Sequence, residues 1–263
     1  MNNIPSNLLE ISHLEICYNH KIIVSDINLA VKSGEILCIV GESGSGKTTL
    51  LKACMGILNK DGAISRGDIF FNGVNLIDGP KNILHKIYGK DINMIWQNAS
   101  TSFCPIRTIG SQLVEYVQQH EKYSKNEVFD IALNLFDKLG LQNGKNLLSR
   151  YPFELSGGMN QRLGIIFAMI LKPQLLFADE PTSALDVTTQ MQVLKELLKL
   201  KKTFNTSIVM VTHNIAIAKY LADKIAVMHK GKIIEYNTAK EIISNPQEDY
   251  TKNLLNAVMY LDI

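Results

Sequence analysis

The sequence lacks most of the features that would place a chain inside a membrane or outside the cell. No apolar run reaches the ~20 residues that a helix needs to cross a bilayer, so membrane spans would have to come from another chain. The four cysteines form no C-x-x-C pair, and we expect reduced thiols of a cytosolic protein. The opening MNNIPSNLLE has no basic start followed by an apolar core, so we expect no signal peptide.

An excess of charge of one sign is also absent. The 27 basic residues, nearly all lysine, are balanced by 25 acidic residues, and the formal net charge is only +2. The densest basic run, KELLKLKK (195–202), is typical of a solvated helix face. This composition argues against a general nucleic-acid-binding protein, and 46% hydrophobic residues are ordinary for a globular fold.

Strand and helix patterns alternate along most of the chain. Apolar and β-branched runs predict strands over 8–18, 22–31, 35–40, 67–73, 92–96, 174–180 and 207–213, and a hairpin over 224–236 with Gly231 in its turn. Helices are predicted over 47–58, 157–172, 187–203 and 214–222, followed by two short C-terminal helices.

The middle of the chain reads as mainly helical. Residues 108–140 have helical spacing and few strand formers, which predicts a helical insertion from about 98 to 172 in an α/β core. On the helix over 187–203, one stripe is expected to pack into the core; it consists of Val187, Met191, Leu194 and Leu198.

The stretch GESGSGKT (41–48) matches the phosphate-binding pattern G-x-x-x-x-G-K-[ST]. Gly41, Gly44 and Gly46 allow backbone N–H groups to converge on phosphates, and Lys47 adds mobile positive charge. The Thr48 hydroxyl is of the type that ligates Mg²⁺. A buried strand precedes the loop and a helix N-terminus follows it, which is the context that such an anion site requires.

Polar residues end two later strands of the same expected sheet. LLFADEP places Asp179 and Glu180 at a carboxyl end, where ligands bind in parallel sheets. Asp179 is expected to hold Mg²⁺ and Glu180 to orient the attacking water, because adjacent side chains on a strand point to opposite faces. His213 ends SIVMVTH in the same way and is expected to reach the γ-phosphate.

A second glycine-rich stretch, LSGGMNQR (155–162), has no lysine. The chain order is then phosphate loop, Gln97 after a strand, LSGGMNQR, LLFADEP, SALD and histidine. This order resembles the nucleotide-binding subunit of ABC transporters over nearly the whole chain. The resemblance gives LSGG a role: it is the signature motif, which closes over ATP held by the phosphate loop of a second subunit, in a head-to-tail dimer.

The resemblance implies a fold and its boundaries. The fold is an α/β P-loop ATPase core with an N-terminal antiparallel β subdomain and a helical subdomain that carries the signature. It implies a single ATP-binding domain over 1–263, with the core at 1–97 and 173–236, the helical subdomain at about 98–172 and a helical tail at 237–263.

The resemblance also assigns site residues. Tyr18 would stack on adenine, Gln97 would touch Mg²⁺ and the water, and Asp186 would meet the partner across the dimer. ATP would be bound by Gly41, Ser43, Gly44, Ser45, Gly46, Lys47, Thr48 and Thr49, and across the dimer by Ser156, Gly157 and Gly158. Catalysis would involve Glu180, His213 and Gln97, and Mg²⁺ would be held by Thr48, Gln97 and Asp179.

Three stretches are similar to the dipeptide, oligopeptide and nickel importers of this family: residues 95–115, RYPFELSGGMNQR (150–162) and NPQEDYTKNLL (245–255). Departures occur at Asn98-Ala99, Phe103-Cys104 and Asn160, near the surface that would dock the membrane subunits. The chain also lacks the C-terminal cysteine cluster of many peptide importers, so its length is closer to the nickel branch or a short peptide branch.

The subgroup implies an ATPase that powers import of a peptide or a nickel or metal chelate from the cytoplasmic face of the membrane. The implied partners are a related second ATPase, two permease subunits and, indirectly, an extracytoplasmic solute-binding protein, with no nucleic acid. Two alternatives are a soluble ATPase acting on nucleic acid or ribosomes and an assembly scaffold such as those of iron–sulfur assembly. The first would need a basic face, a coiled-coil insertion or two cassettes, and the 95–115 block and the C-terminal ending argue against the second.

Overall fold

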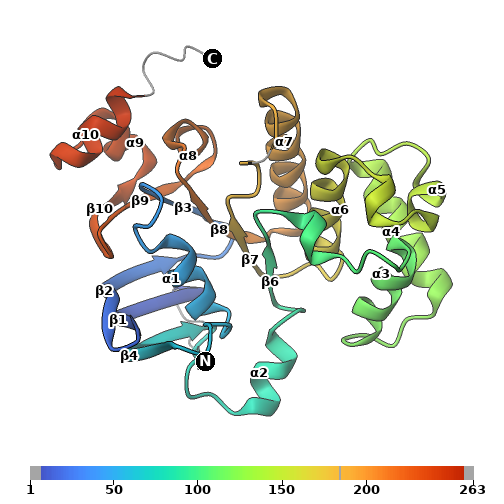
Figure 1. The fold of residues 1–263 in the computed structure, drawn as a ribbon, viewed down its shortest axis with the longest axis horizontal. Coiled ribbons are helices and arrows are strands. Elements are labelled where there is room, and N and C mark those ends of the chain that lie inside the picture. Colours follow the sequence, from blue (N-terminus) through green and yellow to red (C-terminus); the bar gives the residue numbers. More distant parts are fainter. Residues whose placement is uncertain (1–6, 184, 258–263) are drawn as a thin grey trace, which may run out of the picture. The chain divides into compact units, whose positions relative to one another are not determined.

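The computed structural model describes residues 7–183 and 185–257 (Figure 1). The chain forms two compact units: the first comprises Met1–His85 and Ser207–Ile263, and the second comprises Lys86–Thr206. Within the described ranges, no helix combines the length and the apolar character needed to cross a membrane.

The first unit contains an antiparallel sheet in the strand order β2-β1-β4-β5. Its strands are β1 Leu9–Tyr18, β2 Lys21–Val31, β4 Gly62–Phe71 and β5 Val74–Asn75. Residues of β1 alternate between the core and the outside, with Leu9, Ile11, Leu14 and Ile16 buried. This sheet confirms the predicted N-terminal antiparallel β subdomain.

The first unit also contains a parallel arrangement around β3 (Ile36–Val40), whose five residues are all buried. On one side β3 pairs with β8 (Ser207–Thr212), and on the other with β9 (Lys224–His229), which forms a hairpin with β10 (Lys232–Thr238). Burial on both faces explains why β3 is a continuous apolar run. The helices of this unit are α1 Lys47–Cys54, α8 Ile215–Leu221, α9 Ala239–Ser244 and α10 Asp249–Asn256, and α2 Lys81–Ile87 lies at its boundary.

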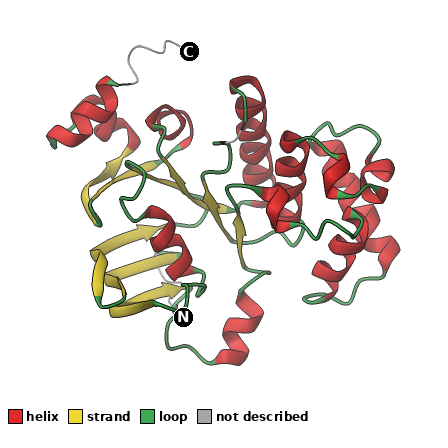
Figure 2. Ribbon diagram, in the orientation of Figure 1, coloured by secondary structure: helices red, strands yellow, loops and turns green. Residues whose placement is uncertain are grey.

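The second unit is mainly helical, and Figure 2 shows red helices over most of it. Its parallel strand pair is β6 Ile92–Ile95 with β7 Leu175–Asp179. Its helices are α3 Ile109–Gln118, α4 Lys125–Lys138, α5 Gly144–Ser149, α6 Gly157–Met169 and α7 Val187–Phe204. Side-chain caps begin four of these helices, at Thr108, Ser124, Ser156 and Asp186. The helical character expected for residues 108–140 is confirmed; the domain boundaries themselves remain a prediction.

Three details differ from the sequence-based expectations. Helix α6 ends at Met169 rather than Lys172, because Lys172 adopts a left-handed conformation (φ 53°) just before Pro173. The predicted α7 stripe is correct only at Leu194: Val187 is 69% exposed, in the first turn of the helix, and Met191 and Leu198 are half-buried. The core face of α7 consists of Val193, Leu194, Leu197 and Leu200. Short elements without clear periodicity, α2, α5 and β5, were not predicted.

A buried ion pair joins three helices of the second unit. Arg162 on α6 donates to both carboxylate oxygens of Glu196 on α7, from Nε at 2.9 Å and Nη2 at 2.5 Å. The same guanidinium donates to the carbonyl of Leu139, which follows the last residue of α4. The two side chains are only 12% and 9% exposed, so the pair has little contact with water. Its geometry therefore fixes the start of α6 against its neighbours.

Replacing Glu196 with alanine is expected to lower the free energy of unfolding by about 3–5 kcal/mol, because it leaves a buried guanidinium without its carboxylate. Glu154 provides a matched control, since it pairs with Arg150 at the surface (46% and 31% exposed). Glu154→Ala should lower the free energy of unfolding much less, because solvent screens an exposed pair. Urea unfolding followed by far-UV circular dichroism measures both, and equal losses would contradict the structural role of the buried pair.

Candidate functional site

The phosphate-loop sequence lies between β3 and α1 in the first unit. Gly44 (φ 81°) and Gly46 (φ 105°) adopt left-handed conformations that other residues rarely tolerate. A Cβ on Gly41 would lie 2.1 Å from the carbonyl oxygen of Met228, so the backbone of β9 packs directly on the start of the loop. Glycine is therefore required here by conformation at two positions and by close packing at a third.

The Lys47 ammonium is buried inside this loop, with the residue only 5% exposed. It donates to the carbonyls of Gly41 and Glu42, both at 2.7 Å, and to the Ser45 hydroxyl at 3.4 Å. These contacts hold the lysine ammonium at a position enclosed by the loop. Such a charge, next to the N-terminus of α1, favours the binding of an anion.

His213 lies at the same sheet edge as the phosphate loop. In the parallel register of β3 with β8, Val40 is paired with Thr212, so Gly41 and His213 both follow paired residues. The chain turns immediately after His213, because Asn214 accepts from the N–H of Ala216 at 2.9 Å and begins α8. The expected placement of this histidine at the carboxyl end of the neighbouring strand is therefore what the structure shows, while its catalytic role remains a prediction.

Tyr18 ends β1 in the first unit, and its ring lies against the backbone of Gly62 on β4. A Cβ at Gly62 would be only 2.7 Å from the ring carbon Cζ, so glycine is needed for this approach. Tyr18 is half-buried, which leaves part of the ring accessible. The contact gives the ring a rigid support, and its stacking on adenine remains a prediction.

In the second unit, the strand pair β6 and β7 brings Gln97 to Glu180. Ile95 is paired with Ala178, so both residues follow closely after paired positions. The Gln97 amide Nε2 lies 3.4 Å from Glu180 Oε2 and 3.2 Å from the Ser183 hydroxyl. Asp179, the last residue of β7, is buried at 5% exposed. Sequence reasoning missed Ser183; its place three residues after Glu180 was the available signal.

Glu180 adopts a left-handed backbone conformation (φ 43°), which is uncommon for a residue other than glycine. Such conformations cost on the order of 1–3 kcal/mol and cluster at functional sites. The turn is held by Ser183, whose N–H and hydroxyl both donate to the Glu180 carbonyl at 3.2 Å. The strained turn separates Glu180 from the regular strand that positions Asp179.

The signature stretch begins α6, beside the beginning of α7. Ser156 caps α6 by accepting from the N–H of Met159 at 3.3 Å. A Cβ on Gly158 would lie 3.0 Å from Thr189 Cγ2, so the two helix starts are in contact. Thr189 is held by Asp186, which accepts from its N–H at 3.0 Å and its hydroxyl at 2.7 Å. These hydrogen bonds from Thr189 lower the pKa of Asp186 and keep it ionised as the cap of α7.

Gln161 links the signature helix to the segment that follows β6. Gln161 is buried, at 4% exposed. Its Nε2 donates to the Trp96 carbonyl at 3.2 Å, and its Oε1 accepts from the Ala99 N–H at 3.1 Å. Both functions of one amide are thus used on the residues flanking Gln97 and Asn98. The sequence showed a displaced glutamine but not this contact.

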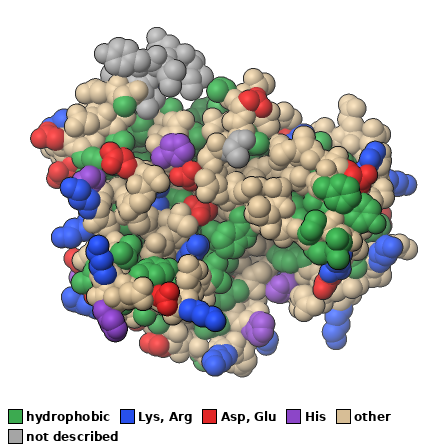
Figure 3. Space-filling view, viewed as in Figure 1, with side chains coloured by type: hydrophobic (Ala, Val, Ile, Leu, Met, Phe, Trp, Pro, Cys, Tyr) green, Lys and Arg blue, Asp and Glu red, His purple; other side chains and the backbone are tan. Residues whose placement is uncertain are grey.

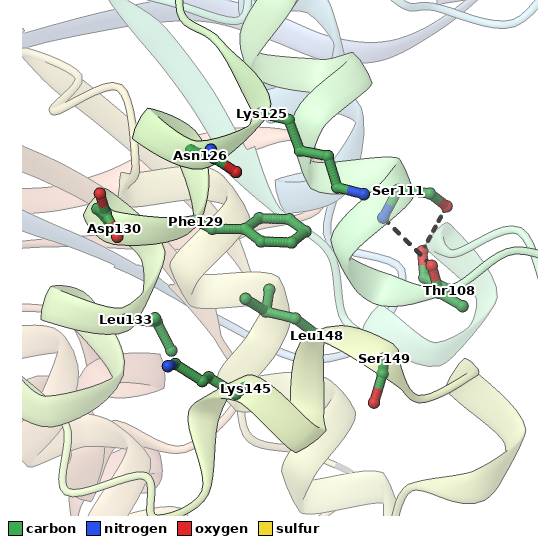
Figure 4. A pocket seen from close by; sticks show the side chains of 10 residues that line it. All are labelled: Thr108, Ser111, Lys125, Asn126, Phe129, Asp130, Leu133, Lys145, Leu148 and Ser149. Carbon is green, nitrogen blue, oxygen red and sulfur yellow. Dashed lines mark hydrogen bonds between the residues drawn. The ribbon is translucent and has the colours of Figure 1, made fainter.

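Among the hollows of the second unit are a groove and a cavity, and Figure 3 shows hydrophobic side chains gathered on the surface over the helices at the right of the view. A groove of about 330 Å³ runs along the Gln97 segment and includes Trp96, Phe103, Arg107 and Phe167. A cavity of about 530 Å³ lies among α3, α4 and α5 (Figure 4), with the Phe129 ring below the Lys125 ammonium, 5.4 Å from it. None of the predicted nucleotide residues lines this cavity.

Comparisons with known proteins place these motifs in context. Residues 24–183 match the model of a family described as ABC transporter. The chain is 41% identical to the oligopeptide transport ATP-binding protein OppD of Escherichia coli K12, over 91% of this chain and 71% of that protein. It is 38% identical to the metal-staphylopine import system ATP-binding protein CntD of Staphylococcus aureus, over 95% of this chain and 92% of that protein. The dipeptide transport ATP-binding protein DppD of Lactococcus lactis is 40% identical over 91% of this chain and 69% of that protein.

Solved structures agree with this fold. The dimeric post-hydrolysis state of the ATP-binding cassette MJ0796, bound to ADP and Pi, has a TM-score of 0.76 at 25% identity and covers 88% of this chain and 98% of that chain. The cbiO1 structure from Clostridium perfringens has a TM-score of 0.77 at 25% identity, over 97% and 95%.

Proposed function

Since this chain belongs to the ABC transporter family and is one of its ATP-hydrolysing subunits, we propose that it powers import of a peptide or a metal chelate through separate permease subunits. The observation that carries this proposal is the 38–41% identity to subunits named for oligopeptide, dipeptide and metal–staphylopine transport, over 91–95% of the chain. Because those relatives are named as transport proteins, a nucleic-acid factor or an assembly scaffold is not favoured.

The phosphate loop is the proposed ATP site. The buried Lys47 ammonium would bind the β- and γ-phosphates, and the N–H groups of the loop would surround them. The loop residues assigned from the sequence, 41–49, supply hydroxyls as well as N–H groups. Tyr18 would support the adenine ring, with Gly62 behind it.

Mg²⁺ is the proposed second cofactor, held by Thr48, Gln97 and Asp179. A hydroxyl, an amide and a carboxylate are the hard oxygen ligands that this ion prefers. When bound, Mg²⁺ would supply positive charge next to the phosphates.

Glu180 is the proposed residue for the attacking water. The Gln97 amide lies 3.4 Å from its carboxylate, and Glu180 sits in a strained turn (φ 43°) just after the regular strand. His213 would contact the γ-phosphate from the end of β8. In this arrangement Glu180 orients and polarises the water, while Lys47 and His213 bind the charge that develops on the phosphate.

The signature residues are proposed to act on the ATP of a second subunit. Ser156, Gly157 and Gly158 offer a hydroxyl and free N–H groups at the start of α6, where the helix dipole favours an anion. Asp186, which caps the neighbouring helix α7, would meet the partner. The proposed assembly is a head-to-tail pair, formed with a related second ATPase.

The groove beside Gln97 is the proposed docking surface for a permease segment. Ile106 is 83% exposed and Trp96 is 38% exposed, and both lie in the 95–115 stretch that resembles importers. Exposed apolar side chains next to a groove are typical of a protein–protein contact. The chain would then work at the cytoplasmic face of the membrane, with a solute-binding protein acting on it indirectly and without nucleic acid.

Glu180→Gln is expected to slow ATP hydrolysis by about 10²–10⁴-fold while ATP and Mg²⁺ stay bound. Trapped ATP should then hold a dimer, visible by gel filtration of the chain alone or with its partner ATPase, and the dimer should separate with ADP. Adding replacements of Ser156 and Gly158 in every signature present should abolish it. A triple variant that still dimerises on ATP would refute the composite site and leave Ser156 as a helix cap only.

Gly157→Ala tests whether glycine is needed at this position for folding or for the close approach of a ligand. A Cβ at Gly157 would meet no atom within 4 Å, and the residue lies in the first turn of α6. Folding should therefore be unchanged or stabilised by about 0.5–1 kcal/mol. We expect turnover of the assembled complex to fall nonetheless, because the added methyl group lies where the partner's ATP would approach. Calorimetry and phosphate release measure the two effects; unchanged turnover would argue against close approach of a ligand.

Ile106→Asp tests the docking surface. The charge should leave ATP binding by the chain unchanged but weaken its capture by detergent-solubilised permeases by about thirtyfold, as for loss of an interface anchor of about 2 kcal/mol. Ile83→Asp is the control, because Ile83 is also exposed (40%) but lies on α2, and it is not among the residues that line this groove. Equal permease binding by both variants would place the contact elsewhere.

A further inference from the structure

The C-terminal helix α10 is attached to the first unit just before Tyr250. The N–H groups of Gln247 and Glu248 donate to the Glu235 carboxylate on β10, at 2.9 Å and 3.4 Å. On the inner side of the helix, Thr251 is completely buried and Leu255 is 8% exposed. The position of Tyr250 is therefore determined by a carboxylate that holds the two residues before the helix and by the packed face of the helix.

The Tyr250 ring lies against His229, with ring centroids 4.1 Å apart and planes tilted by 40°. His229 ends β9, and two residues later the Gly231 N–H donates to the Ser45 carbonyl of the phosphate loop at 3.0 Å. The support of Tyr250 and the support of the loop are thus parts of one hairpin.

The Tyr250 hydroxyl itself contacts the phosphate loop. The Glu42 N–H donates to it at 3.0 Å. Burial is the main cause that raises the pKa of Tyr250, so the phenol is neutral and its oxygen accepts this hydrogen bond.

The geometry of one peptide unit gives this contact its significance. The Gly41 carbonyl and the Glu42 N–H belong to the same planar peptide and point in opposite directions. The carbonyl accepts from Lys47 Nζ at 2.7 Å, and the N–H donates to Tyr250 at 3.0 Å. Glycine at position 41 leaves the plane free to rotate unless both edges are held. The tyrosine on one edge therefore fixes the carbonyl that holds Lys47 on the other.

We propose that Tyr250 is a positioning residue for the phosphate loop, which couples docking of α10 to nucleotide binding through the Gly41–Glu42 peptide. The inference rests on the proposed role of the loop as the ATP site. Coupling of this kind is reciprocal: if docked α10 favours ATP binding, bound ATP must favour docked α10.

The test uses Tyr250→Phe, which keeps the ring against His229 and removes only the hydroxyl. We expect ATP affinity, measured by titration calorimetry of the full chain in EDTA to prevent hydrolysis, to fall roughly three- to tenfold, as for loss of one hydrogen bond. Tyr236→Phe is the matched control, because its hydroxyl donates to the Ala30 carbonyl at 2.7 Å in the same unit. That variant should bind ATP as the wild type does. In the assembled complex, Tyr250→Phe should raise KM with little change in kcat.

Hydrogen–deuterium exchange in α10 distinguishes coupling from a purely structural role of Tyr250, because a structural contact alone would not make amide protection depend on ATP. ATP should increase amide protection in α10 of the wild type, and this increase should be lost in Tyr250→Phe but kept in Tyr236→Phe. If the wild type binds ATP and Lys47→Ala abolishes binding, the proposed ATP site stands. In that case, equal affinity and equal ATP-dependent protection in Tyr250→Phe would overturn the coupling alone. A wild type that binds no ATP would overturn both.

Discussion

Parallel strand pairing is the constraint on which the candidate site depends. Because β3 and β8 run side by side in register, the phosphate loop and His213 leave the sheet at one edge. Because β6 and β7 do the same, Gln97 reaches Glu180. Side chains far apart in sequence are thus placed by backbone hydrogen bonds between buried apolar strands. The apolar runs that make these strands stable also determine where the polar chemistry lies.

Each unit encloses a buried cation, Lys47 in the first and Arg162 in the second, and the two have different hydrogen-bond acceptors. In the first unit, two carbonyls and a hydroxyl of the phosphate loop accept hydrogen bonds from the Lys47 ammonium. In the second unit, the charges of Arg162 and Glu196 neutralise one another, and the pair serves to hold the helices together. A buried cation needs oxygen acceptors of this kind, because it has lost its hydration by water. The arginine pair joins helices, whereas the proposed role of Lys47 is to bind a phosphate.

Local sequence patterns were sufficient for the features that depend on neighbours in the chain. The glycines at 41, 44 and 46, the polar ends of β7 and β8 and the cap at Ser156 are all encoded within a few residues, and the elements around them were predicted. The α7 stripe was correct only at Leu194, because spacing alone does not say which face meets the core, and Val187 begins the helix in solvent. Contacts of Gln161 with residues 96–99 and of Tyr250 with Glu42 join distant segments, so no local pattern reveals them.

The double hydrogen bond of Gln161 has a mechanical consequence. Helix α6 spans 13 residues, about 20 Å at 1.5 Å per residue, and behaves as a stiff rod. Its first turn carries Ser156 and Gly158, and one turn later Gln161 grips the backbone at Trp96 and Ala99. If that backbone moves, helix α6 must move with it, unless the two hydrogen bonds of Gln161 break. The wall of the surface groove and the glycine-rich start of α6 therefore move together: a displacement of the groove wall tilts the start of the helix.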